Sequence, residues 1–296
     1  MKTKIVTSIY SNLYGTDLGG RPSRGSHYRY SLLSLMNMSE ADFVCYTSQE
    51  EYDDLCDFFY NQKNIDQNKL KLKIFDLRNF SFTEKINRIK NIEETKKSDR
   101  CVEIQYCKFI WSLENIEDEC ENLFWFDAGL SHAGLFPTRH MIQNDYWSQN
   151  YNCILFDNKF LNNLIRFAED RIVVVAKENQ MNYWSGTVPN KYYNNHCMER
   201  HIIGGFFGGK QHNMIYYCNL FLDYLNKLLD NESILYFEEH IMSLIFYNHN
   251  ELFKPKYFDI WWHEDDRMPG MDLIEYTKTR KSFYKTIEEI YDYNIN

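Results

Sequence analysis

The sequence predicts an α/β fold in which helices flank a mainly parallel central sheet, and three observations support this prediction. Short β-branched runs bounded by Gly, Asn and Asp residues are typical of strands. Amphipathic segments of about ten to fifteen residues separate these runs, which is the pattern of β-α-β units. One continuous apolar run at 172–176 (IVVVA) indicates a strand that is covered on both faces.

The predicted elements follow one another in order along the chain. Besides 172–176, alternating runs predict strands at 4–10, 42–47, 70–76 and 122–127. Apolar residues with a helical period predict helices at 27–38, 49–59, 102–113, 213–229 and 237–248. The charged segment at 82–100 is expected to be a solvated helix and loop. With 296 residues and no clear linker, the chain is expected to be a single domain, 1–296.

Composition and charge argue against several classes of protein. The 42 acidic residues outnumber the 33 basic residues, giving a formal net charge of -9, so we expect no nucleic-acid partner. Eight cysteines are dispersed without a CxxC pair, which predicts reduced thiols in a cytoplasmic protein. The chain enters a strand pattern at once and holds no apolar run of about 18 residues, so we expect neither a signal peptide nor a transmembrane helix. Peripheral contact with a membrane through aromatic residues stays open.

The strongest candidate for chemistry is Asp127, which follows the apolar run Phe124 to Phe126. Ligands bind at the carboxyl ends of strands in parallel sheets. The small residues Ala128 and Gly129 would let a diphosphate or a metal ion approach the backbone. A carboxylate here suits Mg²⁺ or Mn²⁺, which bridges to phosphate oxygens. The alternative is that Asp127 only caps a turn.

A glycine-rich segment at 202–210 (IIGGFFGGK) is the second candidate. Four glycines around two phenylalanines are favoured where the backbone and a ligand must come close. The segment is neither a Walker loop, since no GK[ST] follows, nor a GxGxxG motif. A tight connection from strand to helix is the alternative.

Two acidic clusters complete the candidate residues. Glu238 and Glu239 begin a predicted helix, whose positive N-terminus favours their ionised form. Either one can orient an acceptor hydroxyl or act as a general base, with helix capping as the alternative. In the run WWHEDD, His263 is a candidate metal ligand and Trp262 a candidate sugar platform. A structural or solvent-exposed histidine is the alternative there.

Taken in order, these segments resemble the GT-A glycosyltransferases, which have a Rossmann-like fold. FWFDAG at 124–129 resembles the hhhDxD turn of that family, and IIGGFFGG at 202–209 resembles the acceptor loop of the blood-group galactosyl and N-acetylgalactosaminyl transferases. More closely, IVTSIY at 5–10, the WFDAG turn and EEHIMSLIF at 238–246 are similar to the bacterial HtrL/YibB-type family. Members of that family occur beside surface-polysaccharide genes.

The resemblance implies a role for each half of the chain: about 1–135 would bind a nucleotide-sugar, and about 136–296 would form an acceptor-binding elaboration. It implies a donor site made of Thr7, Ser8, Tyr10, Asp76, Tyr106, Lys108, Asp127 and Gly129. It implies an acceptor side shaped by Gly205, Phe206, Phe207 and Gly208, to which Trp262 adds the candidate sugar platform named above. Glu239 would be the leading catalytic carboxylate, with Glu238 as the second candidate.

One departure from the family pattern concerns the metal. Gly129 stands where the second acid of DxD is expected, so Asp127 is the one firm carboxylate for Mn²⁺ or Mg²⁺. His263 then completes the site, a water takes the second place, or the enzyme works without a metal. In the last case Arg24 and Arg29 are candidates to neutralise the diphosphate.

The resulting hypothesis is an enzyme that transfers a sugar from a nucleotide-diphosphate donor, most simply a UDP-sugar, to a hydroxyl of a surface glycan such as capsule, lipooligosaccharide or O-antigen. It would act in the cytoplasm, at the inner face of the membrane if it contacts one. Two alternatives stay open. One is a catalytically silent glycan-binding domain, and the other is a transferase that moves a different group on the same nucleotide fold.

Overall fold

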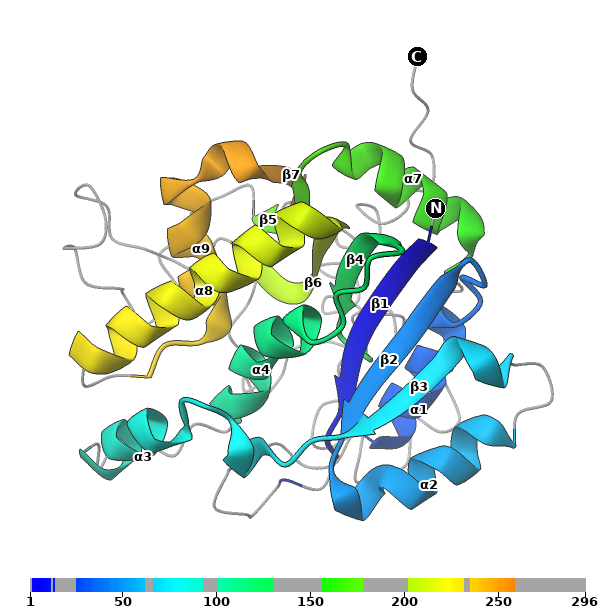
Figure 1. Cartoon of the computed structure of the whole chain (residues 1–296), viewed down its shortest axis with the longest axis horizontal. Coiled ribbons are helices and arrows are strands. Elements are labelled where there is room, and N and C mark those ends of the chain that lie inside the picture. Colours follow the sequence, from blue (N-terminus) through cyan, green and yellow to red (C-terminus); the bar gives the residue numbers. More distant parts are fainter. Residues whose placement is uncertain are drawn as a thin grey trace, which may run out of the picture.

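The computed structural model describes residues 2–11, 13, 25–61, 66–92, 101–129, 156–177, 202–231 and 235–258. These residues build one sheet with the strand order β3-β2-β1-β4-β6-β5-β7 (Figure 1). The strands are β1 (Lys2–Ile9), β2 (Ala41–Thr47), β3 (Leu70–Ile74), β4 (Cys120–Phe126), β5 (Ile172–Lys177), β6 (Ile202–Lys210) and β7 (Phe253–Phe258).

The direction of β6 positions the candidate site. β1 pairs in parallel with β2 and β4, β2 with β3, and β5 with β7, whereas β6 runs antiparallel to both β4 and β5. Because β6 is reversed, its first residues lie beside the carboxyl ends of β4 and β5. The predicted α/β class with a mainly parallel sheet is therefore confirmed, and one antiparallel strand stands in its middle.

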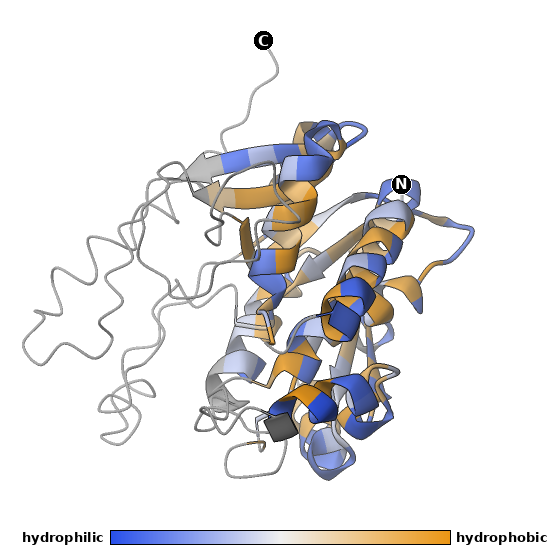
Figure 2. Cartoon of the chain, turned by 90° about the vertical axis from the view of Figure 1, so that its left-hand side faces the viewer, coloured by the Kyte–Doolittle hydropathy of each residue, from blue (hydrophilic) through white to orange (hydrophobic). Residues whose placement is uncertain are grey.

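Helices cover both faces of this sheet. One face packs against α3 (Thr83–Ile92), α4 (Val102–Leu113), α8 (Gln211–Asn231) and α9 (Glu238–Asn248), in a core around Trp111, Trp125, Phe207 and Phe221. The other face packs against α1 (Gly25–Leu35), α2 (Gln49–Tyr60) and α7 (Asn158–Ala168). Hydrophobic and hydrophilic residues alternate along the ribbons of the helices that cover the sheet (Figure 2).

The glycine-rich segment is a strand, β6, and not a loop; it runs directly into α8, as a tight connection from strand to helix would, and its role toward an acceptor stays a prediction. Gly208 and Gly209 are required by close packing between strands: a Cβ on Gly208 would overlap Phe124 and the Leu123 carbonyl, and one on Gly209 would overlap the Arg171 carbonyl. Just before them, Phe206 and Phe207 are buried on opposite faces of the sheet. The four residues from Phe206 to Gly209 build the sheet itself. The first residues of β6 still reach the candidate site.

Two elements were not anticipated from the sequence. α7 begins where the Asp157 side chain accepts a hydrogen bond from Phe160 N–H at 3.0 Å, and it buries Phe160, Leu161 and Leu164 against the sheet. β7 closes the edge of the sheet beside β5. The sheet thus takes strands from both predicted halves of the chain, while the assignment of a donor half and an acceptor half stays a prediction.

Candidate functional site

The candidate site lies at the carboxyl ends of β1 and β4. Asp127 directly follows β4, and its backbone N–H donates to the Gly205 carbonyl at 2.8 Å, which continues the ladder between β4 and β6. The Trp125 indole N–H donates to Asp127 Oδ1 at 2.8 Å. Trp125 and Asp127 are two positions apart in extended backbone and therefore point to the same face, where α4 packs. The Asp127 carboxylate is 43% exposed and so remains accessible to a ligand.

Lys108 of α4 joins Asp127 to the other candidate residues. Its ammonium group donates to the Gly204 carbonyl at 2.9 Å and to Glu238 Oε1 at 3.0 Å, and it lies 3.1 Å from Asp127 Oδ1. It also lies 5.6 Å from the centre of the Trp125 ring. Lys108 is 4% exposed, so this cation is held inside the protein between two carboxylates.

The two acidic residues at the start of α9 make different contacts. Glu238 is buried and turns Oε1 to Lys108, while its Oε2 atom is buried without a hydrogen-bond partner among the described residues. Glu239 Oε1 accepts a hydrogen bond from Gly204 N–H at 3.2 Å. The neighbouring hydrogen bond from Ile202 N–H to Ser243 Oγ, at 2.9 Å, also ties α9 to β6. The sequence had named Glu239 as the leading catalytic carboxylate, and that assignment stays a prediction.

The electrostatics of the cluster follow from its burial. Burial raises the pKa of Glu238 above its usual value, and the nearby charges of Glu239 and Asp127 add to this, while Lys108 acts in the opposite direction. For Lys108, burial favours the neutral form, but Asp127 and Glu238 more than offset it and the pKa of the ammonium lies above its usual value. Lys108 therefore stays charged at neutral pH.

Four of the residues predicted for the donor site lie at different depths. Thr7 is fully buried and Ser8 half-buried in β1, while Tyr10 just beyond β1 stacks on Trp111 and donates to the Phe75 carbonyl at 2.8 Å. Asp76 is exposed and caps a short 3-10 turn (Leu77–Asn79) at the end of β3 by accepting from Arg78 N–H at 2.9 Å.

Other predicted residues are built into the core or lie outside the described part. Tyr106 is buried and its hydroxyl donates to the Tyr236 carbonyl, so its visible contact is structural. Arg29 of α1 pairs with Asp54 at 3.7 Å. Gly129 lies half-buried in the turn after Asp127. Arg24, Trp262 and His263 fall outside the described residues. The donor and acceptor functions of all these residues stay predictions.

The described residues offer a divalent metal ion only part of a site. Asp127 Oδ1 is engaged by Trp125 and Lys108, which leaves Oδ2 as the available oxygen. Within the described ranges, no three His, Cys, Asp or Glu side chains form a group that could hold a metal. The ammonium of Lys108 beside Asp127 already balances one negative charge there. A complete metal site would need further ligands, for which His263 remains the predicted one.

Sequence reasoning missed three parts of this cluster. Trp125 could have been found, because a tryptophan two positions before Asp127 in a strand shares its face. Gly204 had been passed over in favour of Gly205, yet a Cβ on Gly204 would lie 2.5 Å from Glu238 Oε1, whereas one on Gly205 would lie 3.6 Å from Asp127 Oδ2. No signal in the sequence linked Gln105 to this cluster. Its side-chain oxygen accepts a hydrogen bond from Glu238 N–H at 3.4 Å.

Two further observations concern the described chain outside this cluster. A surface hollow lined by Arg171, Phe246 and Phe253 lies at the amino ends of β5 and β7, the sheet edge opposite Asp127, and holds no carboxylate. In the part of the chain that the structure describes, no helix has the length and apolar character to cross a membrane.

No protein-family model and no curated protein matches this chain. Solved structures with a similar chain path include mouse xyloside xylosyltransferase 1 in its apo form, at 11% identity and a TM-score of 0.47, covering 96% of this chain and 94% of the other. Galactosyltransferase LgtC in complex with donor and acceptor sugar analogs is 11% identical with a TM-score of 0.48, covering 94% and 83%.

A third similar structure is 4-diphosphocytidyl-2C-methyl-D-erythritol synthase from Anaerococcus prevotii DSM 20548, at 10% identity and a TM-score of 0.41, covering 96% of both chains. At such identities and scores, these likenesses assign neither activity nor substrate to the chain. The similarity to the HtrL/YibB-type family stays a prediction from the sequence motifs.

Proposed function

We propose that this protein is a glycosyltransferase that moves a sugar from a nucleotide-diphosphate donor to a hydroxyl of a surface glycan. The observation that carries the proposal is the acidic cluster at the carboxyl edge of the sheet. It presents a partly exposed Asp127 carboxylate beside the start of β6 and the acidic start of α9. Ligands of open parallel sheets bind at this edge. The motifs at 124–129, 202–209 and 238–246 support the choice of reaction.

In this reaction, the acceptor oxygen attacks the anomeric carbon, the bond from that carbon to the diphosphate breaks, and the diphosphate departs with the electron pair. The acceptor proton passes to a base. Glu238 and Glu239 are the candidates to orient that hydroxyl or take its proton, because both begin α9 beside Gly204. Asp127 would face the diphosphate side of the donor, from the end of β4.

The finer assignments belong to the same proposal. We expect a UDP-linked donor, a dependence on Mn²⁺ or Mg²⁺ with Asp127 Oδ2 as one ligand, and a place in cytoplasmic polysaccharide biosynthesis. A divalent ion bound there would stabilise negative charge on the departing diphosphate. If the enzyme works without a metal ion, Arg24 and Arg29 are the candidates to neutralise the charge of the diphosphate.

The decisive experiment is a thermal-shift screen of the purified chain against UDP, GDP, CMP and their sugars, each with Mn²⁺ and with EDTA. It is followed by an assay for nucleoside diphosphate released in the presence of glycan acceptors. A Mn²⁺-dependent shift and release of one diphosphate would support the proposal. Nucleotide binding without release would favour a transferase of another group, and glycan binding without nucleotide binding would favour a silent glycan-binding domain.

The two acids of α9 are separated by comparing Glu238→Gln with Glu239→Gln in the same assay. The general base loses at least about 100-fold in turnover when it becomes an amide, since general-base catalysis contributes on the order of 10²–10⁴. The other acid loses less. Equal and small losses for both would remove the start of α9 from the chemistry.

A further inference from the structure

Lys108 had been expected to face the donor, and its surroundings indicate a different role. An ammonium group has three hydrogens to donate. The three oxygens around Lys108 Nζ are all protein atoms, namely the Gly204 carbonyl, Glu238 Oε1 and Asp127 Oδ1, at 2.9, 3.0 and 3.1 Å. Two hydrogen bonds go to Gly204 and Glu238, the ion pair with Asp127 occupies the third side of the ammonium, and the residue is 4% exposed, which leaves little of Lys108 accessible to a phosphate.

The same contacts decide which carboxylate oxygens remain for a ligand. On Asp127, Oδ1 receives both Lys108 and the Trp125 indole N–H, so that Oδ2 is turned away from them. On Glu238, Oε1 receives Lys108 while Oε2 is buried without a partner among the described residues. Leaving a buried carboxylate oxygen without a donor is unfavourable unless a ligand supplies one.

From this geometry we propose that Lys108 is a positioning residue. It binds one oxygen of Asp127 and one of Glu238, and it thereby orients the other oxygen of each carboxylate for the substrate. The Gly204 carbonyl is the third contact and ties the lysine to β6, so one side chain links the end of β4, the start of β6 and the start of α9. This inference deepens the proposed function and rests on it for the word substrate, while the coupling of the three residues stands independently.

Glycine at 204 is part of the arrangement. A Cβ there would lie 2.5 Å from Glu238 Oε1, the oxygen that Lys108 holds, and 3.0 Å from the carboxylate carbon. Because the carboxylate is pinned by Lys108 and buried, it cannot swing away without breaking that contact. Any side chain at this position would therefore separate Glu238 from Lys108.

The first test needs the protein alone. Lys108→Met keeps the length of the apolar stem and removes the charge, and Glu238→Gln is introduced into both the wild-type and the Lys108→Met backgrounds. We expect Glu238→Gln to lower the melting temperature in the wild type, where it weakens the bond to Lys108. In Lys108→Met it should raise the melting temperature, because it removes a buried charge left without a partner. An equal lowering in both backgrounds would overturn the coupling.

The matched control is Lys4→Met. Lys4 is also 4% exposed and pairs with Glu117, but it lies near the amino end of β1, away from Asp127. We expect Lys108→Met to lower kcat by at least tenfold with the donor KM changed less than threefold, and Lys4→Met to change neither. A KM that rises tenfold at unchanged kcat would show that Lys108 binds the donor and would overturn the positioning role.

The two proposals fail in different ways. If the wild-type chain turns over none of the nucleotide-sugars in the screen, the proposed function is wrong, and the melting-temperature cycle still decides whether Lys108 couples Glu238 to the cluster. If turnover is present but Lys108→Met is as active as the wild type, the positioning role is wrong and the proposed function stands.

Discussion

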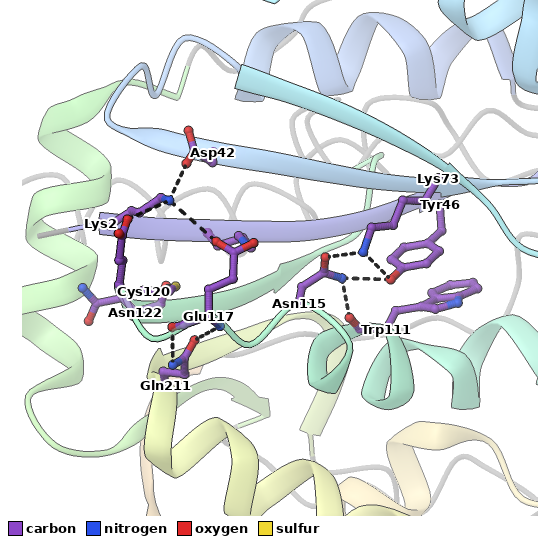
Figure 3. A network of polar contacts seen from close by, with 12 residues as sticks. Lys2, Asp42, Tyr46, Lys73, Trp111, Asn115, Glu117, Cys120, Asn122 and Gln211 are labelled. Atoms are coloured by element: carbon purple, nitrogen blue, oxygen red, sulfur yellow. Dashed lines mark hydrogen bonds and ion pairs between the residues drawn. The ribbon is translucent and has the colours of Figure 1, made fainter. Parts of the chain in front are cut away.

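The two edges of the sheet each hold a buried lysine with carboxylates, and they use it differently. At the amino edge, Lys4 pairs with Glu117, whose carboxylate also lies 3.6 Å from Lys2. Glu117 is further held by Gln211, which accepts from its N–H at 3.2 Å and donates to its carbonyl at 2.9 Å (Figure 3). Both carboxylate oxygens and both backbone polar atoms of Glu117 therefore have partners in the protein.

At the carboxyl edge, the lysine leaves part of the cluster unsatisfied. Lys108 engages one oxygen each of Asp127 and Glu238. The second oxygen of Glu238 is buried without a hydrogen-bond partner among the described residues, while the Asp127 carboxylate is 43% exposed. The two clusters contain the same residue types, so the types alone do not mark a site. The atoms left over after all internal contacts are made distinguish a ligand site from a structural ion pair.

The largest expected effect is that of Asp127→Ala. It removes the carboxylate on which the site is centred, and we expect turnover to fall by at least about 100-fold, as for the loss of one strong electrostatic group from an active site. Stability should fall by about 1–3 kcal/mol, because the Trp125 indole N–H loses its acceptor, while Lys108 keeps Glu238 and the Gly204 carbonyl. Glu117→Gln serves as the control from the other edge and should keep full turnover. A well-folded Asp127→Ala with normal turnover would remove Asp127 from the mechanism.

A smaller effect separates two adjacent glycines. Gly204→Ala should destabilise the protein by about 1–3 kcal/mol, because its Cβ overlaps the pinned Glu238 carboxylate. Gly205→Ala should change stability by less than about 0.5 kcal/mol, because its Cβ would meet Asp127 Oδ2 at 3.6 Å, an ordinary contact distance. Chemical denaturation of both variants measures the difference. Equal costs would show that Glu238 is not held tightly against β6.

The smallest effect concerns pH at the amino edge. The hydrogen bond from Lys4 and the nearby charges of Lys4 and Lys2 hold the pKa of Glu117 below its usual value. The folded state therefore favours the ionised form, and its stabilisation is present above about pH 4.5 and is lost as the pH falls through the lowered pKa. Because the carboxylate is half exposed, Glu117→Gln should cost no more than about 1 kcal/mol at pH 7.

Denaturation of the wild type and Glu117→Gln between pH 3 and pH 7 tests this prediction. The stability difference should shrink as the pH falls below about 4. A difference that stays constant over the whole range would mean that the pair contributes packing and no charge effect.

Local patterns in the sequence were enough for most of the fold. Alternating and apolar runs predicted β1 to β5, and the helical periods predicted α1, α2, α4, α8 and α9 to within a few residues. β6 was misjudged because four glycines mimic a loop; two of them, Gly208 and Gly209, fit in the strand because β4 and the start of β5 approach closely there. The site was partly predicted: Asp127, Glu238 and Lys108 were named one by one, without their contacts.

By itself, the sequence determined the candidates for the chemistry, since an acid at the end of an apolar strand and two acids at a helix start are visible in local patterns. Only the tertiary structure decided how they act together. The antiparallel direction of β6 brings Gly204 close to Asp127 and Glu238. The packing of α4 on that face places the ammonium of Lys108 between these two carboxylates. These contacts join residues up to 130 positions apart, and no local pattern encodes which oxygen of a carboxylate is engaged and which is left for a ligand.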